Sequence, residues 1–136
     1  MLTRPTRSTR TVLAALTVAA LTVPVGLVPP ASASHGGGTD VRTSGHCSGS
    51  AHWSLKAKPD DGRIEVEGEV DSNRAGQVWH WRLKHNGSLS ARGTKRTAGR
   101  SGSFDVERRM ANLAGTDHFT FRATHRRQVC RGTISF

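Results

Sequence analysis

Hydrophobic and polar residues alternate along most of the chain after residue 51, with the period of two that is typical of β-strands with one buried face. The clearest run is Trp53–Val70, which reads WSLKAKPDDGRIEVEGEV. Its alternation is interrupted only by Pro59–Gly62, and these residue types have the backbone preferences of a chain reversal. We therefore predict a β-hairpin with strands over 52–58 and 63–70.

The register of this hairpin follows from the position of its turn. With Pro59 opposite Gly62, the ladder pairs Lys56 with Glu65. One face of the hairpin is then apolar, and the other carries opposite charges directly across the strands. The sequence thus predicts which face is buried.

Similar alternation predicts five further strands, over 77–85, 89–97, 104–110, 118–124 and 129–136. Asn86-Gly87 is the strongest turn signal among them, because both residues accept the positive φ of a type I′ turn. Arg108 breaks the alternation, and we expect its strand to end or twist there. Seven strands without a helical stretch predict an all-β, antiparallel sandwich.

The order of these strands resembles that of an immunoglobulin or fibronectin type III fold. The resemblance implies that the first, second and fifth strands form one sheet. The third, fourth, sixth and seventh strands would form the other.

Export is predicted by the first 33 residues. Three arginines precede an apolar run over 12–28, and Ala31–Ala33 forms a small-residue cleavage site. A membrane anchor is the alternative, but prolines and a glycine interrupt a run that is already short for a bilayer. We predict a signal peptide over 1–33, a flexible Gly/Ser-rich leader over 34–46 and a secreted, extracellular β-sandwich domain over 47–136, with no membrane span after cleavage.

Two cysteines, Cys47 and Cys130, lie near opposite ends of the predicted mature chain. In an exported protein such a pair is expected to form a disulfide. Neither belongs to a C-x-x-C motif, which disfavours a metal or catalytic role. We therefore predict one structural disulfide bond.

Several motifs of residues 34–136 resemble a group of small exported actinobacterial proteins. They are Cys47, the stretch Trp53–Glu67, Asn86-Gly87, Ser101–Phe104, Ala114-Gly115 with Asp117, and Cys130. The resemblance covers nearly the whole predicted mature chain. It implies the fold and carries no activity.

Catalytic and metal-binding patterns are missing from the sequence. The seven histidines include no H-x-H, H-x-x-x-H or H-E-x-x-H spacing, so only tertiary proximity, for example of His80 and His118, would build a metal site. No G-x-S-x-G motif occurs. Carboxylates at Glu65, Glu67 and Glu69 lie near lysines and suit a structural charge ladder. We predict a non-catalytic protein without a metal or cofactor.

Charge adds a surface feature to this picture. The chain has 20 Lys and Arg residues against 10 Asp and Glu residues, and such a basic protein is drawn to anionic partners. Outward positions on the first predicted sheet are mainly acidic: Lys56, Glu65, Glu67, Glu69, Asp105 and Glu107. Those on the second are basic or chargeable and include no acid: His80, Arg82, Lys84, Arg92, Arg122 and Arg131.

We predict that the second set binds a polyanion, either an anionic cell-wall polymer or an acidic polysaccharide. Specific nucleic-acid binding is not expected, because all three tryptophans fall on core positions and leave no platform for base stacking. A merely solvated basic face remains open, as does the oligomeric state. The alternative function is an inhibitor that presents the loop 95–103 to a secreted hydrolase. The hypothesis that the protein is itself a hydrolase is the least favoured.

Overall fold

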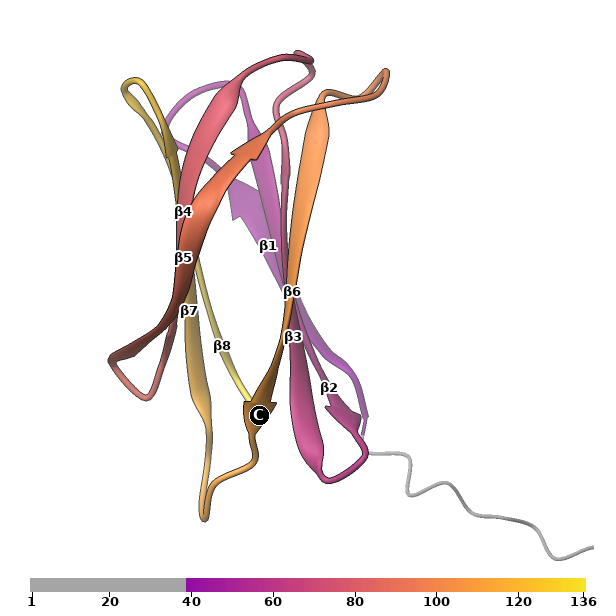
Figure 1. Cartoon of the computed structure of the whole chain (residues 1–136), viewed down its shortest axis with the longest axis vertical. Helices are drawn as coiled ribbons and strands as arrows, with labels where there is room; N and C mark the ends of the chain where they lie inside the picture. The colour runs from indigo at the N-terminus through magenta and orange to yellow at the C-terminus, as the bar shows by residue number, and fades with distance from the viewer. Residues whose placement is uncertain (1–38) are drawn as a thin grey trace, which may run out of the picture. The chain divides into compact units, whose positions relative to one another are not determined.

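Residues 39–136 are described by the computed structural model (Figure 1), and they form eight β-strands. The strands are β1 Val41–His46, β2 His52–Asp60, β3 Arg63–Asp71, β4 Val78–His85, β5 Ser88–Arg96, β6 Ser103–Ala111, β7 His118–His125 and β8 Gln128–Ser135. The predicted signal peptide lies outside the described residues. Within them, no helix is long and apolar enough to cross a membrane.

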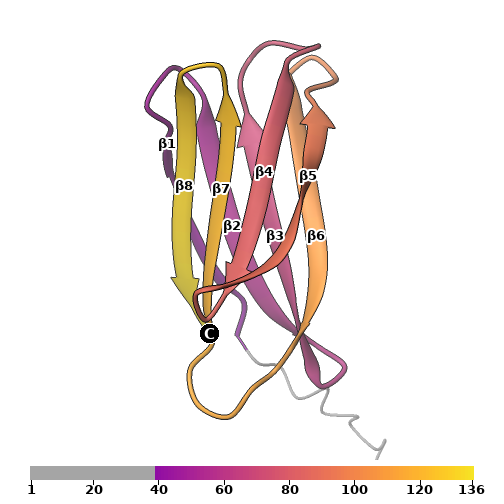
Figure 2. The same cartoon turned by 60° about the vertical axis from the view of Figure 1, so that its left-hand side comes forward.

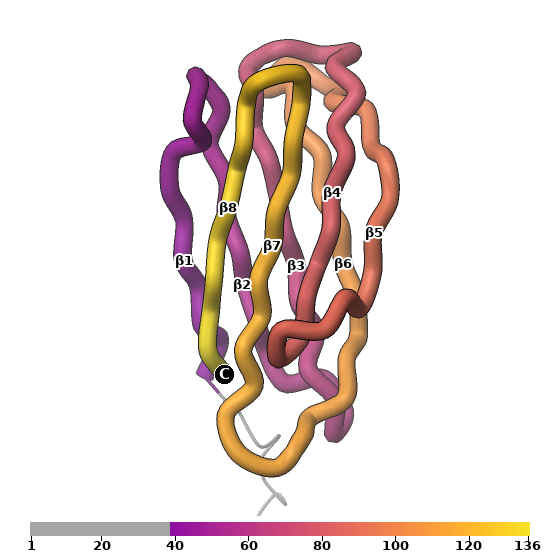
Figure 3. Tube along the Cα trace, turned by 90° about the vertical axis from the view of Figure 1, so that its left-hand side faces the viewer, coloured from indigo at the N-terminus to yellow at the C-terminus, as the bar shows by residue number. Residues whose placement is uncertain are grey.

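The strands form two four-stranded antiparallel sheets that face each other as a sandwich (Figures 2 and 3). One sheet has the order β1-β2-β3-β6 and the other has the order β5-β4-β7-β8. The all-β antiparallel prediction is confirmed. The predicted division of the strands between the sheets is also correct.

The predicted number of strands is one too low, because β1 falls in the segment predicted to be a flexible leader. It pairs with β2 from Val41 opposite Ala57 to His46 opposite His52. Its sequence, VRTSGH, has no hydrophobic alternation. An edge strand of this kind is held mainly by backbone pairing, which leaves little pattern in the side chains.

The predicted register of the β2–β3 hairpin is wrong by two residues. Asp61 and Gly62 both have positive φ, 49° and 75°, and form a two-residue loop between the paired residues Asp60 and Arg63. The predicted loop, Asp60 and Asp61, has the same length but is offset by one position, and the observed loop places Gly62 where a positive φ is required. A shift of two keeps every side chain on its predicted face.

Opposite charges still meet across this hairpin, although between other partners. Lys56 lies opposite Glu67, and Lys58 lies opposite Glu65. The Lys58 Nζ atom is 2.6 Å from Glu65 Oε1. This hydrogen bond raises the pKa of Lys58 above its ordinary value.

Inward-facing side chains of both sheets fill the space between them. The largest fully buried ones include Trp79, Phe119 and Phe121. We expected β6 to end or twist at Arg108, and it does not end there but continues to Ala111. The Arg108 guanidinium lies over the Trp81 ring, 5.1 Å from its centroid, so a cation–π contact replaces the missing apolar residue at this edge.

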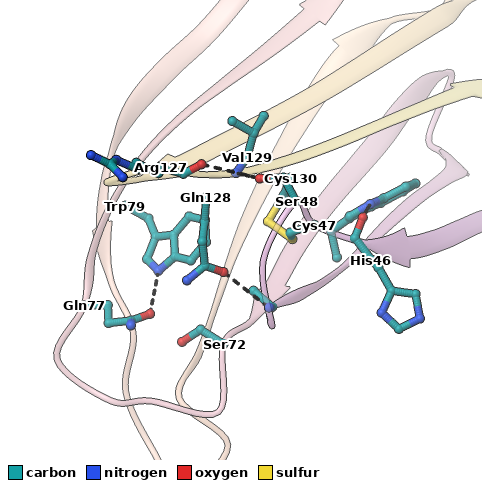
Figure 4. The surroundings of a disulfide bond; sticks show 12 residues. His46, Cys47, Ser48, Ser72, Gln77, Trp79, Arg127, Gln128, Val129 and Cys130 are labelled. Atoms are coloured by element: carbon teal, nitrogen blue, oxygen red, sulfur yellow. Dashed lines mark hydrogen bonds between the residues drawn. A yellow bond between two sulfur atoms is a disulfide. The ribbon is translucent and has the colours of Figure 1, made fainter.

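The predicted disulfide between Cys47 and Cys130 is present (Figure 4). It joins the residue after β1 to the middle of β8, and therefore ties one sheet to the other. Backbone bonds flank it: Ser48 N donates to Val129 O at 2.8 Å, and Val129 N donates to Ser48 Oγ at 2.9 Å. The first and last strands are thus held together covalently and by hydrogen bonds.

A buried carboxylate organises the loop between β6 and β7. The Asp117 side chain is 1% exposed. Its Oδ1 atom lies 2.5 Å from His85 Nε2 and accepts a bond from Asn86 Nδ2 at 3.3 Å, while Oδ2 accepts one from Leu113 N at 3.1 Å. Burial by itself would raise the pKa of Asp117, but the hydrogen bonds and the nearby His85 outweigh it and hold this pKa below its ordinary value.

Loss of the disulfide should strongly destabilise the domain. The two cysteines are 83 positions apart, and a cross-link over a loop of this length contributes roughly 3–5 kcal/mol. We expect a Cys47→Ser/Cys130→Ser variant to lose about that much unfolding free energy in urea titrations. A loss below about 1 kcal/mol would show that hydrogen bonding alone holds β1 to β8.

Asp117 should make stability depend on pH in the acid range. Because its pKa is lower in the folded chain than the ordinary 3.8, its contribution is full above about pH 4 and is lost as the pH falls through the folded-state pKa. Asp117→Asn should lower the unfolding free energy near pH 7 by roughly 2 kcal/mol and remove this acid-dependent part. Urea titrations across pH measure both effects.

Asp61→Asn is the control for that experiment, because Asp61 is an exposed acid in the β2–β3 turn. It should leave both the stability and its acid dependence close to those of the parent. An identical acid profile in the Asp117→Asn variant would contradict the assignment to Asp117.

Candidate anion-binding face

All six residues predicted to bind a polyanion lie on one surface, the outer face of the sheet β5-β4-β7-β8. Strand β4 supplies three of them, and β5, β7 and β8 supply one each: His80, Arg82, Lys84, Arg92, Arg122 and Arg131. They alternate with buried residues such as Trp81 and Leu83, so the period of two turns them away from the core. We call this surface the basic face.

Four arginines of the basic face lie in a single row across the sheet. Arg82 of β4 pairs with Arg92 of β5 and with Arg122 of β7, and Arg122 pairs in turn with Arg131 of β8. Neighbouring strands are about 4.8 Å apart, so the row spans roughly 14 Å. In Figure 3 the strands that carry it run in the order β8, β7, β4, β5.

No carboxylate balances this row on its own sheet. The strands β4, β5, β7 and β8 contain no Asp or Glu. The ion pairs found among residues 39–136 involve none of the six basic residues. Like charges directly opposite each other destabilise a sheet, so the basic face carries repulsion that a bound anion would relieve.

The surface is hollowed along the arginine row. A depression of about 610 Å³ is lined by Arg82, Arg92 and Arg122, by His80, Thr94 and Thr124 on one side of the row, and by Lys84 and Leu89 on the other. A second depression of about 200 Å³ is lined by Arg82, Lys84, Gly87, Thr120, Arg122 and Arg131. A ligand on this face would therefore find room beside the guanidinium groups.

The opposite sheet has the contrasting charge that the sequence predicted. Glu67 lies opposite Glu107, and Glu69 lies opposite Asp105. Glu65 is ion-paired with Lys58 and nearly buried. The strands β1, β2, β3 and β6 also contain six Lys and Arg residues beside their seven Asp and Glu residues, so this sheet is mixed in charge whereas the other is purely basic.

Histidines do not gather into a metal site in the described part of the chain. His80 pairs with Thr124, whereas His118 pairs with Ser135 further along the sheet. No group of three His, Cys, Asp or Glu residues within 39–136 could hold a metal ion. His85 is bonded to the carboxylate of Asp117. His80 and His118 are bonded instead to the hydroxyl groups of Thr94 and Ser135.

The loop 95–103, predicted as the inhibitory segment of the alternative function, is largely folded into the domain. Its first two residues belong to β5. Thr97 is buried, and its Oγ1 donates to Arg74 O at 2.6 Å. Ala98 pairs with Ser103, so only a tight turn remains between them.

Sequence reasoning missed the threonines beside the arginine row. Thr94 and Thr124 both pair with His80, which places the three side chains in a second row parallel to the arginines. The strand pattern marked them as outward-facing. Their alignment depends on the pairing register between strands distant in sequence.

Comparisons with known proteins add no relative to this picture. No protein-family model, curated protein or solved structure matches the chain. Its class therefore rests on the structure itself, an antiparallel β-sandwich with one disulfide and one basic sheet face.

Removing a charge from the arginine row should stabilise the domain. Arg122 faces Arg82 on one side and Arg131 on the other. Arg122→Gln should raise the unfolding free energy at low ionic strength by about 0.2–1 kcal/mol for each relieved pair. The gain should disappear near 1 M salt, where charges are screened within about 3 Å.

Thermal and urea unfolding at two salt concentrations measure this effect. Arg100→Gln is the control, because Arg100 is an exposed arginine in the turn after β5. A destabilised Arg122→Gln variant at low salt would mean that the row is held by favourable contacts.

Proposed function

We propose that the protein is a secreted, non-catalytic module that binds an extracellular or cell-wall polyanion through its basic face. The observation that carries the proposal is the row of four arginines that crosses all four strands of a sheet without an acid. A linear polyanion laid along the row would meet Arg92, Arg82, Arg122 and Arg131 in order. Each contact would relieve the repulsion between neighbouring cations.

Arginine suits this role better than lysine. Its planar guanidinium group donates two parallel hydrogen bonds to a carboxylate or phosphate group. It is also weakly hydrated and always charged, so it loses little on leaving water to contact an anion. A polymer bound in this way would release counterions, and its affinity would fall steeply with salt.

The proposal includes the compartment and the kind of fold. A disulfide persists in oxidising surroundings outside the cytoplasm, which supports export by the predicted signal peptide. The strand orders support an immunoglobulin/fibronectin type III-like sandwich with β1 as an added edge strand. The proposal also keeps the inference that the chain is related to small exported actinobacterial proteins, which its sequence motifs resemble.

Neutralising the row should remove polyanion binding. We expect an Arg82→Gln/Arg122→Gln/Arg131→Gln variant to bind oligogalacturonate or linear inorganic polyphosphate at least about 30-fold more weakly at low salt. The slope of log K against log salt should also fall in magnitude by roughly 2, because three cation contacts are lost. Fluorescence titrations over a salt series measure both quantities.

A matched variant with the same net charge is the control. Arg74, Arg100 and Arg127 are exposed arginines in loops away from the row, and changing all three to Gln should lower affinity only a few-fold. Equal affinity of the two triple variants for both polymers would mean that binding follows net charge alone. If the parent itself bound neither polymer at low salt, the proposed function would be wrong.

A further inference from the structure

The larger depression of the basic face has two chemically different sides. One side is formed by Arg92, Arg82 and Arg122. The other is the parallel row of Thr94, His80 and Thr124, which lies two residues further along each strand. The arginines therefore cross this groove, Lys84 and Leu89 lie beyond them, and hydroxyl and imidazole groups line the edge on the other side of the row.

The second row carries hydrogen-bonding groups on the outer face of the sheet. Thr94 Oγ1 lies 3.2 Å from His80 Nδ1, and Thr124 Oγ1 makes only a long bond of 3.4 Å to the His80 carbonyl group. Hydroxyl groups both donate and accept, and a neutral imidazole ring does so through its two nitrogens. This edge is suited to hydroxyl groups of a ligand, whereas the arginine edge is suited to anions.

We propose that the groove binds an acidic polysaccharide with a carboxylate on each sugar ring, laid across the strands of the sheet. This inference rests on the proposed function and names its ligand class. The carboxylates would lie along the arginine edge, and the ring hydroxyl groups would face Thr94, His80 and Thr124. Inorganic polyphosphate has the charge for the first edge but no hydroxyl groups along its chain for the second.

The spacing of the arginines agrees with this ligand. Cations follow one another at intervals of about 4.8 Å across the strands, and a chain with one carboxylate on every ring repeats its charge at nearly the same interval. Carboxylates that face the sheet would meet arginines of the row, and the flexible arginine side chains would take up differences in spacing. Affinity for oligogalacturonates should rise steeply with length until the chain spans the row of roughly 14 Å, and more gradually beyond it.

Two pairs of threonines provide a matched test. Thr94 and Thr124 lie on the groove side of the arginine row, while Thr116 and Thr133 are exposed and line neither depression of the basic face. Valine keeps the shape of threonine and favours strands, so both double variants should fold. Thermal unfolding checks that their stabilities stay close to that of the parent.

We expect Thr94→Val/Thr124→Val to weaken oligogalacturonate binding about tenfold or more, because two hydrogen bonds to ligand hydroxyl groups are lost. Polyphosphate binding should stay within about twofold of the parent, since the arginine row is intact. Thr116→Val/Thr133→Val should leave the affinity for both polymers unchanged. Titrations at one fixed salt concentration measure all three proteins.

The outcomes separate this inference from the function on which it rests. If Thr94→Val/Thr124→Val binds oligogalacturonate as tightly as the parent, or loses both polymers equally, the proposed orientation and ligand class are overturned. The polyanion-binding function would still stand if the arginine variant fails to bind. If the arginine variant binds both polymers as the parent does, the function and the inference fall together.

Discussion

Backbone pairing of β4 with β5 on one side and with β7 on the other determines where every side chain of the basic face lies. Because the pairing is antiparallel and side chains alternate, one register brings Arg92, Arg82 and Arg122 into a line, and the β7–β8 hairpin adds Arg131. A slip of one residue would turn these arginines toward the core. The inward side chains, Trp81 and Leu83 among them, hold the register by their burial.

The arginine row is unfavourable to the isolated domain, and under the proposed function it would be relieved by a bound anion. Like charges across strands lower stability, and natural proteins often keep such unfavourable groups where function requires them. Here the disulfide and the buried polar network supply compensating stability. Cys47–Cys130 joins the two sheets at one side of the sandwich, and Asp117 binds the β4–β5 turn to the β6–β7 loop through His85 and Asn86.

The Asp117 network also bears on the surface beside the row. Asn86 N donates to His118 O at 2.8 Å, and Asn86 Oδ1 accepts from His118 N at 2.8 Å. The turn that carries Gly87, which lines the smaller depression, is thereby fixed to the start of β7. The Asn86 side chain donates to Asp117 through its nitrogen and accepts from His118 through its oxygen. Asn86 therefore has a structural role in this turn.

The sequence by itself determined the strands with one buried face, the cysteine pair and the identity of the outward basic residues, while the division of the strands between two sheets followed from the resemblance to an immunoglobulin-like fold. Burial imposes a period of two on each of these strands, and that period is visible in the sequence. The strand β1, the β2–β3 register and the continuation of β6 past Arg108 were not predictable in this way, because backbone pairing and a cation–π contact replace hydrophobic alternation there. Only the tertiary structure decided that the arginines form one row beside Thr94, His80 and Thr124, since that alignment depends on register between strands far apart in the chain.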